Sequence, residues 1–375
     1  MIQITEKKSC AGCTACAAVC PKGAISMVAD EWGLSYPEVD TEKCVDCGLC
    51  DKICPFDKET HGTEERIAYA LKHNDPSVLE KSTSGGIFTA VSDYVLSAGG
   101  VVYGAAIDDN IVVRHTRATT PDERDRMRGS KYVQSELGDT LVSVKRDLAA
   151  GKKVLFVGTP CQVAGLKSYL GNKCDGLITL DLICHGVPSP LIYKEHIGFL
   201  SKKLNTKIID YKFRPKKWGW HVHREIACGE KREYHSTPYT DLWRYLYYSR
   251  IATRPSCNNC PYSNLSRVGD ITIGDCRGID RVLPDFKSYE GVTLAIVNTD
   301  VGKAVFEAIS DTVTAVALNV SDVMQPPLRQ SSKPNPESER FFEIYKTKGY
   351  KAAISEYYGP TYVLKYYIKK MLRRI

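Results

Sequence analysis

Short apolar runs separated by polar and glycine-rich segments recur between residues 85 and 205. Strands are predicted at VVYGAAI, IVVRHT, KVLFVG and LITLDLI because each run is short, apolar and rich in β-branched residues. The spacing of apolar positions predicts helices over 85–97, 136–150 and 191–204 and from about Gln162 onward, with Ser82–Ser84 capping the first. Strands that alternate with helices in this way predict a mixed or mostly parallel sheet covered by helices.

The first 60 residues follow a different pattern, a doubled cysteine run. The spacing C-x2-C-x2-C-x3-C-P occurs twice, first as Cys10, Cys13, Cys16 and Cys20 and then as Cys44, Cys47, Cys50 and Cys54. Between the runs, apolar segments flank a turn at Glu31–Gly33, which predicts a hairpin beside the cysteines.

This doubled run is typical of a ferredoxin with two [4Fe-4S] clusters, in which the fourth cysteine of each run ligates the other cluster. One cluster is therefore predicted to be held by Cys10, Cys13, Cys16 and Cys54, and the other by Cys44, Cys47, Cys50 and Cys20. Zinc sites and disulfides are the alternatives. Zinc motifs usually pair C-x2-C units, and a disulfide scaffold requires an oxidising compartment. The chain is predicted to carry single electrons.

Charge divides the chain into an acidic beginning and a basic remainder. The net charge is +7, with −4 in residues 1–60 and +11 in the rest. A basic body favours phosphate-bearing ligands, anionic membranes or nucleic acid, but no helix-turn-helix, zinc-finger or RNP motif supports nucleic acid binding. The sequence has no apolar run of 18 residues and no signal-peptide pattern, which predicts a cytoplasmic protein. The 15 cysteines then serve metals or redox chemistry.

A second set of cysteines lies in the later part of the chain. Cys161 and Cys184 each follow the end of a predicted strand, where ligands collect in open α/β sheets. Cys257 and Cys260 form a C-x2-C unit before a proline. Four cysteines from three loops could hold a third cluster. From spacing alone, inert buried thiols, a redox dithiol and half of a zinc site remain open.

Six short motifs in residues 81–330 occur in a characteristic order. They are S-G-G-I at 84–87, G-S-K-Y-V at 129–133, T-P-C-Q at 159–162, I-C-H at 183–185, C-N-N-C at 257–260 and G-D-I-T-I-G-D at 269–275. Together they resemble the family of β-subunits of the coenzyme factor 420 (deazaflavin) hydrogenases and dehydrogenases. The chain departs from the family pattern at Asp275-Cys276-Arg277-Gly278, where an aromatic pair is common.

The resemblance implies an FAD beside a third [4Fe-4S] cluster. Its ligands would be Cys161, Cys184, Cys257 and Cys260. The flavin pocket would be formed by Ser84, Gly85, Gly86, Gly129, Ser130, Lys131 and Tyr132. Glycines before a helix let backbone amides approach a pyrophosphate, and a lysine can neutralise phosphate or stabilise a reduced flavin. The alternatives for these residues are a plain helix cap and a surface lysine.

Histidine is a candidate proton donor because it titrates near neutral pH. His185 is the strongest candidate, since it follows the proposed ligand Cys184. Packing or hydrogen bonding is the more common role of a histidine.

The basic C-terminal segment, residues 331–375, begins after a proline-rich break. Apolar residues from Val363 to Ile375 repeat at helical spacing opposite lysines and arginines. Such a helix can make peripheral contact with an anionic membrane, or pack on its own body or on a partner.

These observations predict an α/β protein (α+β overall) in four parts. They are a ferredoxin-like two-cluster domain at 1–60, a linker at 61–80, a mixed-sheet flavin and iron–sulfur domain at 81–330 and a basic helical tail at 331–375. The predicted function is an oxidoreductase that passes electrons between a ferredoxin-like carrier and an organic two-electron substrate, because a flavin converts between one- and two-electron chemistry. The alternatives are an electron-transfer subunit that feeds a partner oxidoreductase subunit, and a protein with structural or sensory clusters.

Overall fold

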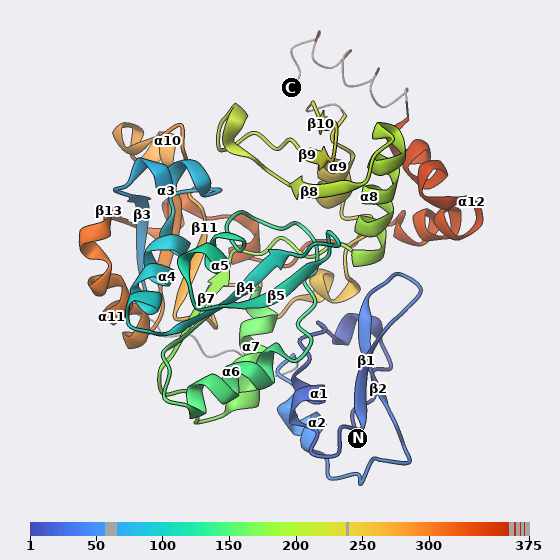
Figure 1. Ribbon diagram of the computed structural model, residues 1–375, viewed down its shortest axis with the longest axis horizontal. Coiled ribbons are helices and arrows are strands. Elements are labelled where there is room, and N and C mark those ends of the chain that lie inside the picture. Colours follow the sequence, from blue (N-terminus) through green and yellow to red (C-terminus); the bar gives the residue numbers. More distant parts are fainter. Residues whose placement is uncertain (57–65, 238–239, 360–363, 365–367, 369–370, 372–375) are drawn as a thin grey trace.

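A mixed sheet of eight strands forms the centre of the computed structural model (Figure 1). The structure describes residues 1–56, 66–237 and 240–359, together with residues 364, 368 and 371. The strand order is β13-β3-β12-β11-β7-β6-β4-β5. The strands are β3 (Ile67–His73), β4 (Val101–Ile107), β5 (Val113–Ala118), β6 (Val154–Gly158), β7 (Leu177–Leu182), β11 (Ile271–Asp275), β12 (Thr293–Val297) and β13 (Val313–Leu318). β4, β6, β7 and β11 are parallel neighbours, and the outer pairs are antiparallel. The predicted mixed α/β sheet is confirmed.

Helices cover both faces of this sheet. α4 (Ile87–Ser97) and α11 (Asp300–Ala308) pack on one face, and α6 (Thr140–Ala149) and α7 (Pro160–Leu170) pack on the other. Successive residues of β4 and β6 point alternately into these two layers, as the pleat of a strand requires. The short helices of this body are α3 (Pro76–Lys81), α5 (Pro121–Asp125) and α10 (Ile279–Val282).

Two local predictions in this body were wrong. α4 begins at Ile87 after Gly86, whose φ of +88° suits glycine, and no side chain caps it. Ser84 instead donates its hydroxyl to the Val292 carbonyl at 2.8 Å. In addition, residues 67–73 of the predicted linker form β3, which pairs with β12 and β13 inside the sheet.

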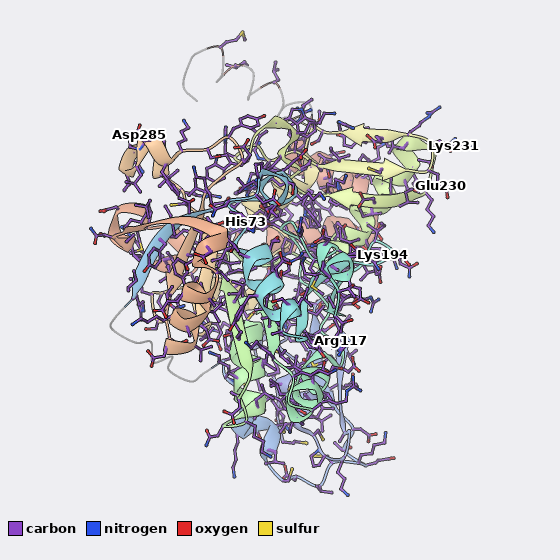
Figure 2. The ribbon with its side chains drawn as sticks, turned by 60° about the vertical axis from the view of Figure 1, so that its left-hand side comes forward. His73, Arg117, Lys194, Glu230, Lys231 and Asp285 are labelled. Carbon is purple, nitrogen blue, oxygen red and sulfur yellow. The ribbon has the colours of Figure 1, made fainter. Side chains whose placement is uncertain are left out.

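A smaller lobe packs beside the main sheet. It contains β8 (Ile208–Lys212), β9 (Ile226–Gly229), β10 (Glu233–His235), α8 (Pro190–Leu204), α9 (Leu242–Ser249) and α12 (Ser338–Tyr358). Residues from these elements share one hydrophobic core. Figure 2 shows Glu230 and Lys231 at the tip of the β9–β10 hairpin, directed away from the body. α12 therefore belongs to a packed lobe, although it lies within the predicted tail.

The first 56 residues form a separate unit against α7 and α8. Its elements are α1 (Ala15–Val19), β1 (Ile25–Ala29), β2 (Ser35–Val39) and α2 (Leu49–Ile53). β1 and β2 pair as an antiparallel hairpin from Ile25–Val39 to Ala29–Ser35, so the predicted hairpin is confirmed. Ala15 of α1 is buried in the core formed by α6 and α7, which joins this unit to the main sheet.

Most of the predicted amphipathic helix near the C-terminus lies outside the described residues, so its membrane contact stays a prediction. Among the residues that the structure describes, no helix combines the length and the apolar character needed to cross a membrane. Turns of 3-10 helix complete the fold at Lys7–Ser9, Lys216–Trp218, Pro255–Asn259, Pro284–Phe286, Ser310–Thr312, Val320–Val323 and Pro326–Leu328.

Candidate redox site

The doubled cysteine run forms two separate small cavities. One is lined by Cys10, Cys13, Cys16 and Cys54, and the other by Cys20, Cys44, Cys47 and Cys50. The helices α1 and α2 explain why the fourth cysteine of each run lines the cavity of the other run. Cys16 and Cys50 lie inside these helices, whereas Cys20 and Cys54 cap their far ends. The spacing predicts the same two groups of four cysteines, and their binding of clusters stays a prediction.

The surroundings of these thiols fit an iron–sulfur cluster. The Ile2 amide lies 3.2 Å from Cys50 Sγ and the Ala24 amide 3.3 Å from Cys20 Sγ, so backbone N–H groups point at sulfur. Burial raises the pKa of Cys16 to about 12, and bound iron would keep this thiol deprotonated. Within the described ranges, no three His, Cys, Asp or Glu side chains are arranged to hold a single metal ion, whereas a four-iron cube holds its ligands farther apart.

The later cysteines come together from three separate segments of the chain. Cys161 lies in the first turn of α7, Cys184 follows β7, and Cys257 and Cys260 lie in and after the turn at Pro255–Asn259. Burial raises the pKa of Cys257, and the nearby thiols of Cys184, Cys161 and Cys260 raise it further. Burial likewise raises the pKa of Cys161 to about 11 and that of Cys184 to about 12. Four neighbouring, half-buried thiols are suited to an iron–sulfur cluster, which is anionic and holds them as thiolates.

Helix α7 connects this set to the N-terminal unit. A Cβ on Gly165 would lie 2.9 Å from Cys13 Sγ, so only glycine lets α7 approach this thiol so closely. Cys161, one turn earlier on the same helix, lines the cavity of Cys10, Cys13, Cys16 and Cys54 as well as the large cavity described next. Tyr262 is buried, lines the first of these cavities and donates its hydroxyl to the Pro55 carbonyl at 3.0 Å.

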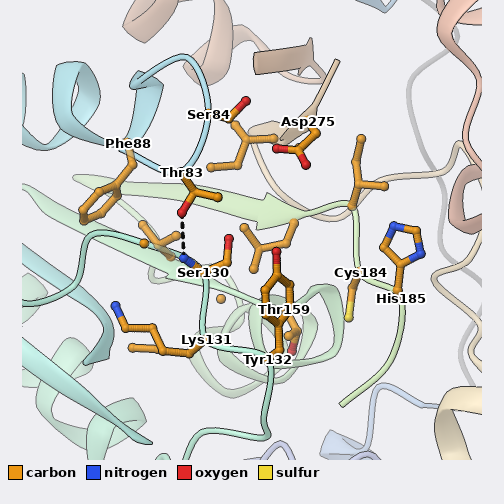
Figure 3. Close-up of a pocket in the computed structure, with 18 of the residues that line it drawn as sticks. Thr83, Ser84, Phe88, Ser130, Lys131, Tyr132, Thr159, Cys184, His185 and Asp275 are labelled. Atoms are coloured by element: carbon orange, nitrogen blue, oxygen red, sulfur yellow. Dashed lines mark hydrogen bonds between the residues drawn. The ribbon is translucent and has the colours of Figure 1, made fainter. Parts of the chain in front are cut away.

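A larger cavity of about 280 Å³ opens at the carboxyl ends of β6, β7 and β11 (Figure 3). Its volume lies near the lower end of the usual range for small-molecule sites. The predicted flavin residues that line it are Ser84, Gly86, Gly129, Ser130, Lys131 and Tyr132. Gly85 lies just beneath, where its amide donates to Thr293 Oγ1 at 2.8 Å. The opposite wall contains Cys161, Cys184 and His185, so the cavity adjoins the later cysteine set.

The cavity wall also offers a helix N-terminus. Gly86, Ile87 and Phe88 begin α4 and line the cavity, and no side chain caps this end. Uncapped amides at the positive end of an eleven-residue helix are suited to an anion such as a pyrophosphate. Ser130 is fixed opposite them, because its amide donates to Thr83 Oγ1 at 3.0 Å. These residues fit the phosphate part of FAD.

Three family models match parts of this chain. The family model for the C terminus of the coenzyme F420 hydrogenase/dehydrogenase beta subunit matches residues 151–322, and the model for the N-terminal part of the same subunit matches residues 68–141. A 4Fe-4S dicluster domain matches residues 9–58. The chain belongs to the family of coenzyme F420 hydrogenase/dehydrogenase beta subunits. The family indicated by the six motifs is thus confirmed, and the chain is an iron–sulfur protein of a redox enzyme family.

Individual relatives are distant. The F subunit of the F(420)H(2) dehydrogenase of Methanosarcina mazei is 23% identical over 330 residues, which cover 82% of this chain and 84% of that protein. An uncharacterized ferredoxin of Methanocaldococcus jannaschii is 40% identical over 52 residues, 14% of this chain and 66% of the ferredoxin. A chain of the F420-reducing [NiFe] hydrogenase complex from Methanosarcina barkeri has a TM-score of 0.48 and 18% identity, over 79% of this chain and 92% of that one.

Lys131 is positioned differently from the expectation drawn from the F420 beta subunits. Its Nζ donates to the carbonyls of Met127 at 2.7 Å, Arg128 at 2.9 Å and Arg126 at 3.3 Å. Burial lowers its pKa to about 7. The amino group therefore holds the segment after α5 in place, and contact of Lys131 with phosphate or flavin stays a prediction.

Arg214 is a cavity residue that the sequence did not single out. Its guanidinium forms a bidentate pair with Asp275, at 2.8 and 3.1 Å, and donates to Tyr132 Oη at 3.0 Å. Tyr132 in turn lies against Tyr247, with ring centroids 4.7 Å apart. The motif residue Asp275 was visible in the sequence, but nothing in the segment K-F-R-P marks Arg214 as its partner.

His185 lines the same cavity, next to Cys184. Burial, with smaller contributions from the nearby Arg277 and Arg250, lowers its pKa to about 4. The imidazole is consequently neutral at pH 7, which suits it to hydrogen bonding at the cavity wall. Donation of a proton to a substrate by His185 stays a prediction.

Proposed function

We propose that this chain passes electrons between a ferredoxin-like one-electron carrier and an organic two-electron partner through three [4Fe-4S] clusters and FAD. The observation that carries the proposal is the position of Cys161. This residue lines both the cavity of Cys10, Cys13, Cys16 and Cys54 and the large cavity at the strand ends. Electrons could therefore pass from the first cavity to the second without a rearrangement of the fold.

Electrons would pass through the clusters of the three cysteine sets in order, from the protein surface to the large cavity. Cys47 is exposed, so Cys20, Cys44, Cys47 and Cys50 would hold the cluster nearest to a docked carrier. The set of Cys10, Cys13, Cys16 and Cys54 lies between this surface and α7. Cys161, Cys184, Cys257 and Cys260 would hold the third cluster beside the cavity. The relative from Methanosarcina mazei is named as one subunit of a dehydrogenase, which supports a partner oxidoreductase subunit as the electron source.

FAD would supply the conversion between single electrons and hydride in the large cavity. The amides of Gly86 and Ile87 would bind its pyrophosphate at the start of α4. Tyr132 and Tyr247 provide an aromatic wall, with their rings inclined at 48° to each other. Arg214 keeps a positive charge at this wall, because Asp275 holds its guanidinium in place from the end of β11.

The second candidate is an electron-transfer subunit with no organic substrate of its own. The same relative from Methanosarcina mazei favours it, because a subunit of a dehydrogenase can serve the substrate site of another subunit. The two candidates differ in what the isolated chain does. An enzyme given a chemical reductant converts an organic acceptor, whereas a relay subunit passes electrons only to its partner.

Anaerobic purification followed by iron, sulfide and flavin analysis tests the proposal. We expect about twelve irons and one FAD per chain, from three four-iron clusters. Cys257→Ser should remove about four irons, while Cys174→Ser, at a cysteine outside all three sets, should leave the iron content unchanged. About eight irons without flavin would refute the third cluster and the flavin. Reduction of the purified protein and a screen of organic acceptors, followed by flavin reoxidation, then separates the two candidates.

A further inference from the structure

Arg254 is fully buried at the junction of the N-terminal unit, the large cavity and the third cysteine set. It precedes the turn at Pro255–Asn259, and its carbonyl accepts the Cys257 amide at 3.0 Å. Its side chain crosses to the N-terminal unit, where Nε donates to the Cys10 carbonyl at 2.8 Å. One residue thus touches the segments that carry two different cysteine sets.

All the hydrogen-bond partners of the Arg254 guanidinium are neutral groups, apart from one sulfur. Nη1 donates to Gln134 Oε1 at 3.1 Å, and Nη2 donates to the Ser35 carbonyl at 3.0 Å. Nη2 also lies 3.7 Å from Cys10 Sγ. The guanidinium lies over the ring of Tyr36, 4.4 Å from its centroid. These contacts of the cation are therefore with neutral groups and with the thiol of a predicted cluster ligand.

Other buried arginines of the described chain are paired with carboxylates. Arg267 lies 3.0 Å from Asp181, and Arg214 pairs with Asp275. Arg124 likewise pairs with Asp93 and Asp125. Arg254 has no such ion pair among the described residues. An isolated buried charge is costly unless an opposite charge lies nearby. We therefore expect a negatively charged group beside Cys10 to balance the charge of Arg254.

We propose that Arg254 is the counter-charge of the [4Fe-4S] cluster held by Cys10, Cys13, Cys16 and Cys54, and that it raises the reduction potential of this cluster. The inference rests on the proposed function for its ligand assignment. A cluster with four thiolates is anionic, and one more electron makes it more so. A fixed cation in a low-dielectric site stabilises the reduced form more than the oxidised form.

The position of Arg254 determines which of the two N-terminal clusters this effect favours as the site of the electron. The cluster at Cys10, Cys13, Cys16 and Cys54 (the inner cluster) would accept one electron from the cluster at Cys20, Cys44, Cys47 and Cys50 (the outer cluster), which would be oxidised, without transfer of a proton. Because Arg254 contacts Cys10, it would favour the electron on the inner cluster, beside α7. Gln134 holds Arg254 from the cavity side, and its Nε2 donates to the Ala11 carbonyl at 3.2 Å. The arginine is thus fixed from both sides of the junction.

Redox titration monitored by electron paramagnetic resonance tests the inference on the full cluster-loaded protein. Signals of the two clusters are first assigned from those lost in Cys16→Ser and Cys50→Ser. Arg254→Met should lower the midpoint potential of the Cys10 cluster and leave that of the Cys50 cluster unchanged. Arg254→Lys keeps the positive charge and should retain most of the wild-type potential. Arg340→Met, which removes an arginine that is 60% exposed on α12, serves as the control and should shift neither potential.

Three results would overturn the role of Arg254. They are an intact Cys10 cluster with unchanged potential in Arg254→Met, an equal shift of both clusters, and an equal shift in the Met and Lys variants. If Arg254→Met loses iron, Arg254→Gln removes the charge while keeping hydrogen-bond donors to the same carbonyls, and the same criteria apply. A wild-type protein without a cluster at Cys10 would instead refute the proposed function, which the iron analysis detects separately.

Discussion

The indole ring of Trp32 stacks on the phenyl ring of Phe342, with ring centroids 4.1 Å apart and ring planes 5° apart. Trp32 lies in the hairpin turn of the N-terminal unit, and Phe342 lies on α12 of the small lobe. The Trp32 carbonyl also accepts the hydroxyl of Ser189, and Gly33 lies against Leu191 at the start of α8. The N-terminal unit is therefore held to the body by a contact between residues that are distant in the sequence.

This contact predicts a measurable coupling between the two rings. Offset-stacked aromatic pairs contribute about 0.5–1.5 kcal/mol beyond the area they bury. Trp32→Ala, Phe342→Ala and the double variant form a cycle in which the free energy of unfolding is measured by urea denaturation. We expect a coupling of about 1 kcal/mol. Tyr289→Ala, at a side chain that is 64% exposed, combined with Phe342→Ala should give no coupling. Additive losses in the Trp32–Phe342 cycle would contradict the contact.

The outcome of the sequence-based predictions depended on how local their signals were. The hairpin at 24–40 and the strands from 101 to 182 follow from short-range apolar patterns, and all of them form. The start of α4 was misplaced because Ser84 finds its partner at Val292, more than 200 residues away. β3 was missed because its neighbours in the sheet, β12 and β13, come from the other end of the chain.

The candidate site residues likewise include some that have a recognisable sequence pattern and others that have none. The two N-terminal cysteine sets could be proposed from their spacing, whereas the third set was proposed from the family resemblance together with two strand ends and one C-x2-C unit. Arg214 and Arg254 could not, because an arginine has no characteristic spacing to a partner that only the fold supplies, such as Asp275 or the Cys10 carbonyl. Lys131 was found through its motif, but its contacts to three carbonyls depend on the path of the chain after α5.

The exchange of the fourth cysteines between the two runs predicts a specific pattern of iron loss. Cys54→Ser should remove about four irons, and so should the pair Cys54→Ser and Cys13→Ser, because both residues line one cavity. Cys54→Ser combined with Cys47→Ser should remove about eight, since Cys47 lines the other cavity. Iron and acid-labile sulfide analysis of anaerobically prepared protein distinguishes these cases. A loss of about eight irons in the first pair and four in the second would require each run to ligate its own cluster.

The flavin pocket should be sensitive to a single methyl group at Gly85. A Cβ there would lie 2.1 Å from the Leu71 carbonyl oxygen and 2.7 Å from the Thr293 amide, so the start of α4 would have to move. We expect Gly85→Ala to weaken FAD binding at least about tenfold, equivalent to about 1.4 kcal/mol, while the iron content stays unchanged. Flavin absorbance after dialysis, with the iron content measured alongside, provides the test.

Gly198→Ala is the matched control for this change. Gly198 lies on α8, and no other group lies within 4 Å of the point that a Cβ would occupy, so alanine there should retain flavin and stabilise the helix by up to about 1 kcal/mol. Full flavin retention in Gly85→Ala would show that the start of α4 does not contribute to the flavin pocket.

A buried ion pair remote from the redox site predicts how stability depends on pH. Asp147 on α6 accepts hydrogen bonds from Arg117 at 2.7 and 3.1 Å and from Tyr103 Oη at 2.6 Å, and Lys152 lies 3.1 Å away. The hydrogen bonds from Arg117 contribute most to holding the pKa of Asp147 well below its usual value of 3.8. The carboxylate is buried, whereas Arg117 and Lys152 are partly exposed to water.

Because the folded-state pKa of Asp147 is lowered, its stabilising effect is fully present above pH 3.8 and is lost as the pH falls through the lower value. We expect Asp147→Asn to reduce the free energy of unfolding by about 2 kcal/mol at pH 7, less than for a fully buried pair because water screens Arg117 and Lys152. The difference between the two proteins should stay constant from about pH 5 to pH 8 and shrink only below 3.8, as measured by urea denaturation at each pH. A difference that grows on acidification would mean that the pKa of Asp147 is raised in the folded protein, and the ion pair would then not be its main stabilising contact.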